Sequence, residues 1–139
     1  MNLYQFDKGY RYNSDTLLLY DFIAQFEPKG NVLDVGCGCG ILGLLLKRDF
    51  PQIAMQLLDI QEQNCMLSKE NAKLNNIDIA SFICSNFLEA TFETKWDAIV
   101  SNPPFYANGG VKSENEMLRL SRHSSALPFE PFALRSQNH

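Results

Sequence analysis

The sequence predicts an α/β fold in which helices flank a doubly wound, mostly parallel sheet. Short apolar segments that indicate buried strands alternate with longer segments that indicate helices between residues 31 and 101. A glycine-rich stretch at 36–40 separates the first of these strands from the first helix. With 139 residues, 45% of them hydrophobic and 20% charged, the chain has the length and composition of one globular domain.

Before residue 31, a hairpin and a helix are predicted. Aromatic residues alternate at period two on both sides of a turn at 7–9, which indicates a hairpin over residues 3–12. Ser14 or Asp15 can cap a helix that continues to about Glu27. One side of this helix carries four apolar residues: Leu17, Leu18, Phe22 and Phe26.

After residue 30, strands and helices alternate. Strands are predicted at 31–35, 55–60, 81–84 and 96–101, and helices at 41–48 and 61–75. If the strands lie in the order 3-2-1-4, the fourth is an edge. No strand signal follows residue 127, so we expect the sheet to be truncated after its fourth strand. A homo-oligomer, a strand swap or another partner would then complete it.

Cysteine spacing, apolar runs and charge limit the functional classes. The cysteines at 37, 39, 65 and 84 lack the spacing of zinc ligands, so we expect reduced thiols and no metal. No apolar run approaches the roughly 20 residues of a membrane span, and the N-terminus lacks the pattern of a secretory signal. We therefore expect a cytoplasmic protein without membrane contact. The net charge of −4 gives little support to RNA binding.

The glycine-rich stretch and the acid before it predict a cofactor site. Asp34 ends the first strand, and Gly36, Gly38 and Gly40 allow close approach of a ligand to the backbone. A dinucleotide would place its pyrophosphate at the helix N-terminus. S-adenosylmethionine has no phosphate, and the acid suits its ammonium group, so we favour this cofactor. The alternative for Asp34 is a purely structural carboxylate.

Three further positions are predicted to contact the nucleoside part of the cofactor. Asp59 ends the second strand, where a carboxylate would accept from both ribose hydroxyls. The alternative is a surface cap of the next helix. Asn86 and Phe87, after the third strand, would lie beside the adenine ring with Ile60 on its other face. The alternative for Phe87 is a place in the core.

The most specific motif is Asn102-Pro103-Pro104-Phe105, directly after the fourth strand. The two prolines remove backbone donors, so the carbonyls of this turn can face a ligand. The Asn102 side-chain oxygen and the Pro103 carbonyl can both accept from one planar amino group, and Phe105 can stack on a planar base. The motif therefore predicts methylation of an exocyclic or amide nitrogen by positioning. A plain turn is the alternative.

On these motifs the chain resembles the class I S-adenosylmethionine-dependent methyltransferases whose fourth strand ends in N/D-P-P-Y/F/W, which implies a Rossmann-like fold. Within them it is most similar to the tRNA adenine-N6 methyltransferases that modify a valine tRNA. The resemblance rests on FDKGYRYNSDTLLL (6–19), VLDVGCGCGILGL (32–44), LLDIQ (57–61), VSNPPF (100–105) and the pair at 122–123. It departs at Asn86, where the family usually has an aspartate.

The resemblance also implies roles for the two ends of the chain. Residues 1–30 would cover the methionine end of the cofactor, with Tyr12, Asp15 or Thr16 near it, and residues 31–139 would form the incomplete binding domain. For Asp15 and Thr16 the alternative is a helix cap. Contact with a tRNA or other RNA is expected from the basic side chains after the NPPF motif: Lys112, Arg119, Arg122 and His123.

Several functions stay open beside RNA adenine-N6 methylation. Ribosomal RNA guanine-N2, protein glutamine-N5 and DNA adenine methylation are the alternatives among enzymes. A truncated, catalytically weak cofactor-binding module is the alternative that is not an enzyme in the ordinary sense. An NAD-linked oxidoreductase would share the α/β pattern but leaves the NPPF motif unexplained.

Overall fold

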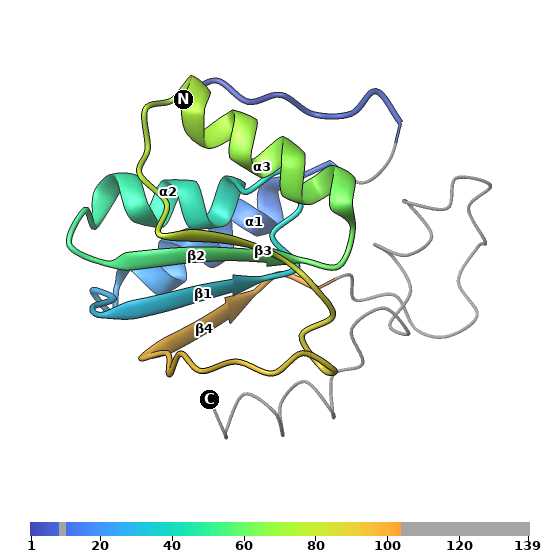
Figure 1. Cartoon of the computed structure of the whole chain (residues 1–139). Coiled ribbons are helices and arrows are strands. Elements are labelled where there is room, and N and C mark those ends of the chain that lie inside the picture. The colour runs from blue at the N-terminus through green and yellow to red at the C-terminus, as the bar shows by residue number, and fades with distance from the viewer. Residues whose placement is uncertain (9–10, 104–139) are drawn as a thin grey trace, which may run out of the picture.

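The computed structural model describes residues 1–8 and 11–103 (Figure 1). It contains α1 (Ser14–Ala24), β1 (Asn31–Val35), α2 (Ile41–Asp49), β2 (Ala54–Asp59), α3 (Glu62–Leu74), β3 (Ser81–Cys84) and β4 (Ala98–Ser101). The strands are parallel and lie in the order β3-β2-β1-β4. Strands β2 and β3 are added in turn on one side of β1, and β4 then pairs with the other side of β1. The predicted doubly wound sheet and its strand order are therefore confirmed.

The central strands are buried because each face of the sheet packs against its own cluster. Alternate side chains of β1 point to opposite faces. Val32 belongs to a cluster with α2 and α3, against which residues of α1 also pack. Leu33 belongs to a second cluster, formed with residues of the 85–97 segment. In the described part, the three helices therefore cover one face, and the 85–97 segment covers the other.

Aromatic rings of the 85–97 segment form much of the second cluster. The Phe87 and Phe92 rings stack with centroids 5.7 Å apart, and Phe92 meets Trp96 edge to face at 5.1 Å. Such pairs contribute about 0.5–1.5 kcal/mol beyond the burial of their area. This segment therefore attaches to the sheet through aromatic packing, although it contains no helix.

The predicted hairpin over residues 3–12 is wrong, because no described residue in that range belongs to a strand. The N-terminal segment instead runs alongside α3 (Figure 1). There the backbone of Tyr4 hydrogen-bonds to the side chain of Asn71, and that of Asn2 to the side chain of Asn75. Aromatic alternation suggested a strand, but side-chain amides supply the partners that a second strand would have supplied.

Helix α1 differs from its prediction in cap, end and packing. Asn13 is the N-cap, since its Oδ1 accepts from the Asp15 N–H at 3.1 Å, so neither Ser14 nor Asp15 fills that role. The helix ends at Ala24 and not near Glu27. Its four predicted apolar residues are exposed, at 44% for Leu17, 66% for Leu18, 57% for Phe22 and 70% for Phe26. The helix packs through its opposite side, with Thr16, Leu19, Tyr20 and Ile23.

Candidate functional site

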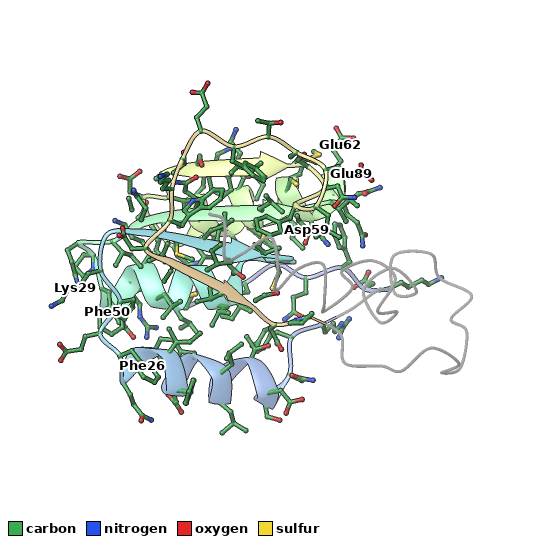
Figure 2. The ribbon with its side chains drawn as sticks, turned by 90° about the horizontal axis from the view of Figure 1, so that it is seen from below. Phe26, Lys29, Phe50, Asp59, Glu62 and Glu89 are labelled. Carbon is green, nitrogen blue, oxygen red and sulfur yellow. The ribbon has the colours of Figure 1, made fainter. Side chains whose placement is uncertain are left out.

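The candidate site lies at the carboxyl edge of the sheet. Because all strands are parallel, the glycine loop after β1, Asp59 at the end of β2 and Asn102 after β4 meet at this edge. Figure 2 shows Asp59 at the end of the molecule opposite to Phe26, Lys29 and Phe50. The strand order reverses between β1 and β4, and such reversal points are where open α/β sheets bind their ligands.

The glycines of the loop have two different roles. Gly36 and Gly38 have positive φ angles of 72° and 56°, and a Cβ at either would meet no atom within 4 Å. Gly40, with φ of 86°, lies so close to α3 that a Cβ there would be 3.0 Å from the Ser68 Cβ. Gly36 and Gly38 therefore leave open space for a ligand beside the backbone, whereas Gly40 permits close packing.

Asp59 holds the glycine loop in place. Its Oδ2 accepts from the Gly38 N–H at 2.9 Å, and its Oδ1 accepts from the Gln61 N–H at 2.9 Å and from Asn64 Nδ2 at 3.3 Å. Burial raises the pKa of this carboxyl, and the hydrogen bonds oppose that rise. A carboxylate has about four acceptor positions; the three bonds above occupy most of them, and the Ile60 backbone N–H also acts on this group. Bonds to both ribose hydroxyls would require one of the present bonds to open.

Asp34 lies below the loop and joins β1 to the first turn of α2. It is 1% exposed, and its Oδ2 accepts from the Gly43 N–H at 3.1 Å. The pKa of Asp34 is raised to about 7, chiefly by burial; the hydrogen bond from Gly43 opposes this rise, and the charge of Asp59 adds to it. These contacts support the structural alternative for Asp34, while contact with the ammonium group stays a prediction.

Asn102 connects the motif after β4 to helix α1. Its Nδ2 donates to Thr16 Oγ1 at 2.9 Å, across 86 positions of sequence. Thr16 is 3% exposed. The neighbouring Ser101 hydroxyl donates to the Val35 carbonyl at 2.8 Å and so ties the end of β4 to the start of the glycine loop. With Nδ2 bound to Thr16, the amide oxygen is the atom of this side chain that could accept from a ligand.

The other predicted N-terminal contacts are less closely tied to this edge. Tyr12 is half-buried and Asp15 is exposed. Because Asn13 caps α1, the cap alternative is wrong for both Asp15 and Thr16. Of the three predicted residues, Thr16 hydrogen-bonds to Asn102 within the part of the NPPF motif that the structure describes.

The side chains predicted to contact adenine differ in how far they are exposed to a ligand. Phe87 is 2% exposed and belongs to the core, which supports its alternative role. Asn86 is half-buried, and its Oδ1 accepts from the Leu88 N–H at 3.0 Å. Ile60 is 47% exposed at the carboxyl edge and is therefore available to a ligand.

Some predicted positions lie outside the described residues, namely Pro104, Phe105, Lys112, Arg119, Arg122 and His123. Pro103 is half-buried and directly follows Asn102. Within residues 1–8 and 11–103, no group of three or more acidic, histidine or cysteine side chains could hold a metal ion. None of the helices described there is long and apolar enough to cross a membrane.

Sequence reasoning missed the polar residues of α3 that support the site. The buried residues of this helix are Asn64, Ser68, Asn71 and Ala72. Their spacing of three and four positions follows one helix face, so the polar residues at 64, 68 and 71 could have been found by searching α3 for a polar stripe that faces the sheet. A search for hydrophobic periodicity does not find them, because it assigns polar residues to the exposed face. Buried amides occur where hydrogen-bond partners are present, and the sequence does not reveal those partners.

We expect Gly38→Ala to weaken cofactor binding more than it weakens the fold. The added Cβ enters open space, so the expected loss of stability is the strain of positive φ, about 1–2 kcal/mol. The alanine methyl group would occupy space that the ligand is proposed to fill, so affinity for S-adenosylhomocysteine should fall at least ~10-fold. Isothermal titration and thermal unfolding measure the two effects.

Gly43→Ala is the matched control for that prediction. A Cβ there would lie 2.3 Å from Leu57 Cδ2 and 2.8 Å from Met55 Cε in the core. We expect this variant to lose stability but to retain affinity while folded. Equal losses of affinity in both variants would contradict the division of roles among the glycines.

The geometry first defines a class of protein. A parallel sheet in this order, with an open glycine loop after β1 and an acid after β2, defines a Rossmann-like domain. The chain belongs to the methyltransferase small domain family, whose model matches residues 6–125.

Curated relatives support this membership. The chain is 39% identical over 93 residues to ribosomal RNA small subunit methyltransferase C of Haemophilus ducreyi, which covers 65% of this chain and 27% of the relative. It is 31% identical over 121 residues to the tRNA1(Val) (adenine(37)-N6)-methyltransferase of Pedobacter heparinus, which covers 86% of this chain and 51% of the relative. The chain thus spans about a quarter to a half of the length of these relatives.

Solved structures share the fold. The PH0226 protein of Pyrococcus horikoshii matches with a TM-score of 0.54 and 26% identity, over 62% of this chain and 38% of that one. The PRMT1 enzyme-prozyme complex of Trypanosoma brucei, solved with AdoHcy, matches with a TM-score of 0.53 and 25% identity, over 63% and 28%. The fold is therefore that of the class I methyltransferases.

Proposed function

We propose that this chain binds S-adenosylmethionine at the carboxyl edge of its sheet and serves methyl transfer to an exocyclic nitrogen of RNA. The observation that carries the proposal is the hydrogen bond between Asn102 and Thr16 beside a glycine loop with open space at Gly36 and Gly38. This bond joins the NPPF motif to the N-terminal helix, and the bond from Ser101 to the Val35 carbonyl joins the end of β4 to the start of the glycine loop. This is the arrangement that the methyltransferase resemblance implies.

The chain's own residues fit this cofactor. The open side of Gly36 and Gly38 would receive its methionine part, and the exposed Ile60 offers an apolar surface to its adenine. Asp59 would hold a ribose hydroxyl while it keeps Gly38 in place. When bound, S-adenosylmethionine supplies an electrophilic methyl group on a sulfonium.

Asn102 would position the nitrogen that accepts the methyl group. Its oxygen and the Pro103 carbonyl are acceptors, and together they would hold a planar amino group by its two protons. Thr16 fixes the orientation of the Asn102 amide by accepting from its nitrogen. Catalysis would then come from orientation and not from a strong base, and a base in an RNA loop is more accessible than one in a stem.

We favour the N6 position of a tRNA adenine as the target. The similarity to the Pedobacter heparinus tRNA enzyme extends over 86% of this chain and thus includes most of its motifs. Ribosomal RNA is the second candidate, since the ribosomal RNA methyltransferase C of Haemophilus ducreyi has the higher identity, 39%, over a shorter segment. Transfer of labelled methyl to purified tRNA and to ribosomal RNA distinguishes the two.

Thermal unfolding with S-adenosylmethionine, S-adenosylhomocysteine and NAD tests the cofactor. We expect S-adenosylmethionine and S-adenosylhomocysteine to raise the midpoint temperature of unfolding and NAD to leave it unchanged. Ligand at 100 times its dissociation constant stabilises by about 2.7 kcal/mol, which is readily measured. A rise with NAD alone would overturn the proposal. Light scattering on the same sample tests the separate expectation that another copy of the chain pairs with the sheet.

A further inference from the structure

Helix α3 holds the N-terminal segment through two asparagine side chains. Asn71 Oδ1 accepts from the Tyr4 N–H at 2.6 Å, and its Nδ2 donates to the Tyr4 carbonyl at 3.0 Å. Asn75 repeats this pair of bonds with Asn2, at 3.0 Å and 2.7 Å. The four helical residues from Asn71 to Asn75 advance about 6 Å, and the two extended residues from Asn2 to Tyr4 advance about 6.6 Å, so the spacings match. Each amide acts as a strand partner for one residue.

This docking leads the N-terminal segment toward the candidate site. Residue 2 lies at the carboxyl end of α3 and residue 4 lies one turn nearer its start, so the segment runs antiparallel to the helix. The start of α3 directly follows Asp59 at the carboxyl edge of the sheet. The chain beyond Tyr4 therefore approaches the edge that carries the glycine loop, as the course of the segment beside α3 in Figure 1 shows.

Asn71 differs from Asn75 because it also contacts the glycine loop. Its Nδ2 donates a second hydrogen bond to the Cys39 carbonyl at 2.9 Å. Asn71 is 0% exposed, and its amide uses its oxygen and both donors in these three bonds. Cys39 stands between Gly38 and Gly40, so this bond fixes the part of the loop where φ is positive on both sides.

A second contact shows that α3 sets the position of the loop. The Ser68 side chain, three positions before Asn71, lies close enough to Gly40 that a Cβ there would be 3.0 Å away. The buried face of α3 around these residues is mostly polar, so the amide hydrogen bonds take a large part in holding helix and loop together. A loop held before the ligand arrives binds it more tightly, because less ordering is needed on binding.

We propose that Asn71 is a positioning residue of the cofactor site: it holds the glycine loop by the Cys39 carbonyl, and the N-terminal segment orients its amide. The inference rests on the proposed function, since it assigns a residue to the same site. Docking of Tyr4 and the shape of the loop are thereby coupled through one side chain. Asn75, which binds the N-terminal segment but not the loop, provides the matched control.

The test compares Asn71→Ala and Asn71→Asp with Asn75→Ala in the full chain. Asn71→Asp keeps an acceptor for the Tyr4 N–H but loses the donors to the carbonyls of Cys39 and Tyr4. Binding of S-adenosylhomocysteine is measured by titration well below every unfolding midpoint, and hydrogen exchange is measured at the amides of Gly38 and Gly40. If Asn71→Ala does not fold, Asn71→Ser, which keeps a polar group in the buried position, replaces it.

We expect both Asn71 variants to bind S-adenosylhomocysteine about 10-fold more weakly and to exchange the two loop amides about 10-fold faster. Asn75→Ala should stay within about twofold of the parent in both readouts, even where its midpoint falls. Unchanged affinity and exchange in the Asn71 variants, or equal changes in Asn75→Ala, would overturn the inference.

Hydrogen exchange separates this inference from the proposed function. If the parent chain binds no S-adenosylhomocysteine, the proposed cofactor is wrong. Faster exchange at Gly38 and Gly40 in the Asn71 variants alone would still support the coupling, and unchanged exchange would refute it.

Discussion

Asn102→Ala is expected to reduce methyl transfer to RNA at least ~100-fold while binding of S-adenosylhomocysteine changes by less than about threefold. The physical reason is that the variant removes the acceptor that would orient the amino group, and removal of one well-placed polar contact of this kind lowers turnover by about 100- to 1,000-fold. Single-turnover transfer of labelled methyl measures the chemical step, and titration measures the cofactor.

The bond to Thr16 requires its own control. Asn102 also donates to the Thr16 hydroxyl, so Asn102→Ala removes a link to α1 as well as the proposed acceptor. Thr16→Val keeps the shape of the buried side chain and removes only that link. We expect it to reduce transfer much less, since the Asn102 oxygen is retained as an acceptor although its amide loses the bond to Thr16 that orients it. If Thr16→Val lowers transfer as strongly as Asn102→Ala, positioning of α1 and not the Asn102 acceptor explains the effect.

Asp34→Asn is expected to stabilise the chain at pH 8 and to flatten its dependence of stability on pH. The folded pKa of Asp34 is raised from 3.8 to about 7, chiefly by burial. Between these values the folded chain keeps a proton that the unfolded chain releases, so stability falls as pH rises from about 4 to about 7. At about 1.4 kcal/mol per pKa unit, the loss is on the order of 4 kcal/mol.

Urea unfolding of parent and variant at pH 5, 6, 7 and 8 measures this effect. The asparagine oxygen can still accept from the Gly43 N–H, so the contact with α2 is retained. A residual slope is expected from Asp59, whose pKa burial also raises. Asp49, whose pKa Arg48 lowers to about 2, titrates below this range. Parallel slopes in parent and variant would contradict the assignment to Asp34.

The same variant distinguishes the two roles of Asp34. If the carboxylate attracts the ammonium group of the cofactor, affinity for S-adenosylhomocysteine at pH 8 should fall at least ~10-fold. If it is purely structural, affinity should stay within about threefold. Its bond to Gly43 and its 1% exposure favour the structural role.

The sequence by itself determined the sheet and the edge at which the candidate site is proposed. Its strands were predictable because apolar segments of four to six residues, separated by helical segments, allow few alternatives to a parallel sheet. Gly36, Gly38, Asp59 and Asn102 were predictable as edge residues because each lies at or shortly after the end of a strand, and parallel strands all end at one edge. These inferences depend on local order along the chain.

Only the tertiary structure decided which side chains face the site and which support it. Phe87 could stack on a ligand or join the core, and its packing with Phe92 and Trp96 selects the core. The segment around Tyr4 alternates like a strand, yet it docks on Asn71, 67 positions away. Hydrophobic periodicity carries no information about an amide that binds backbone at such a separation, since its partners are defined only when the chain has folded.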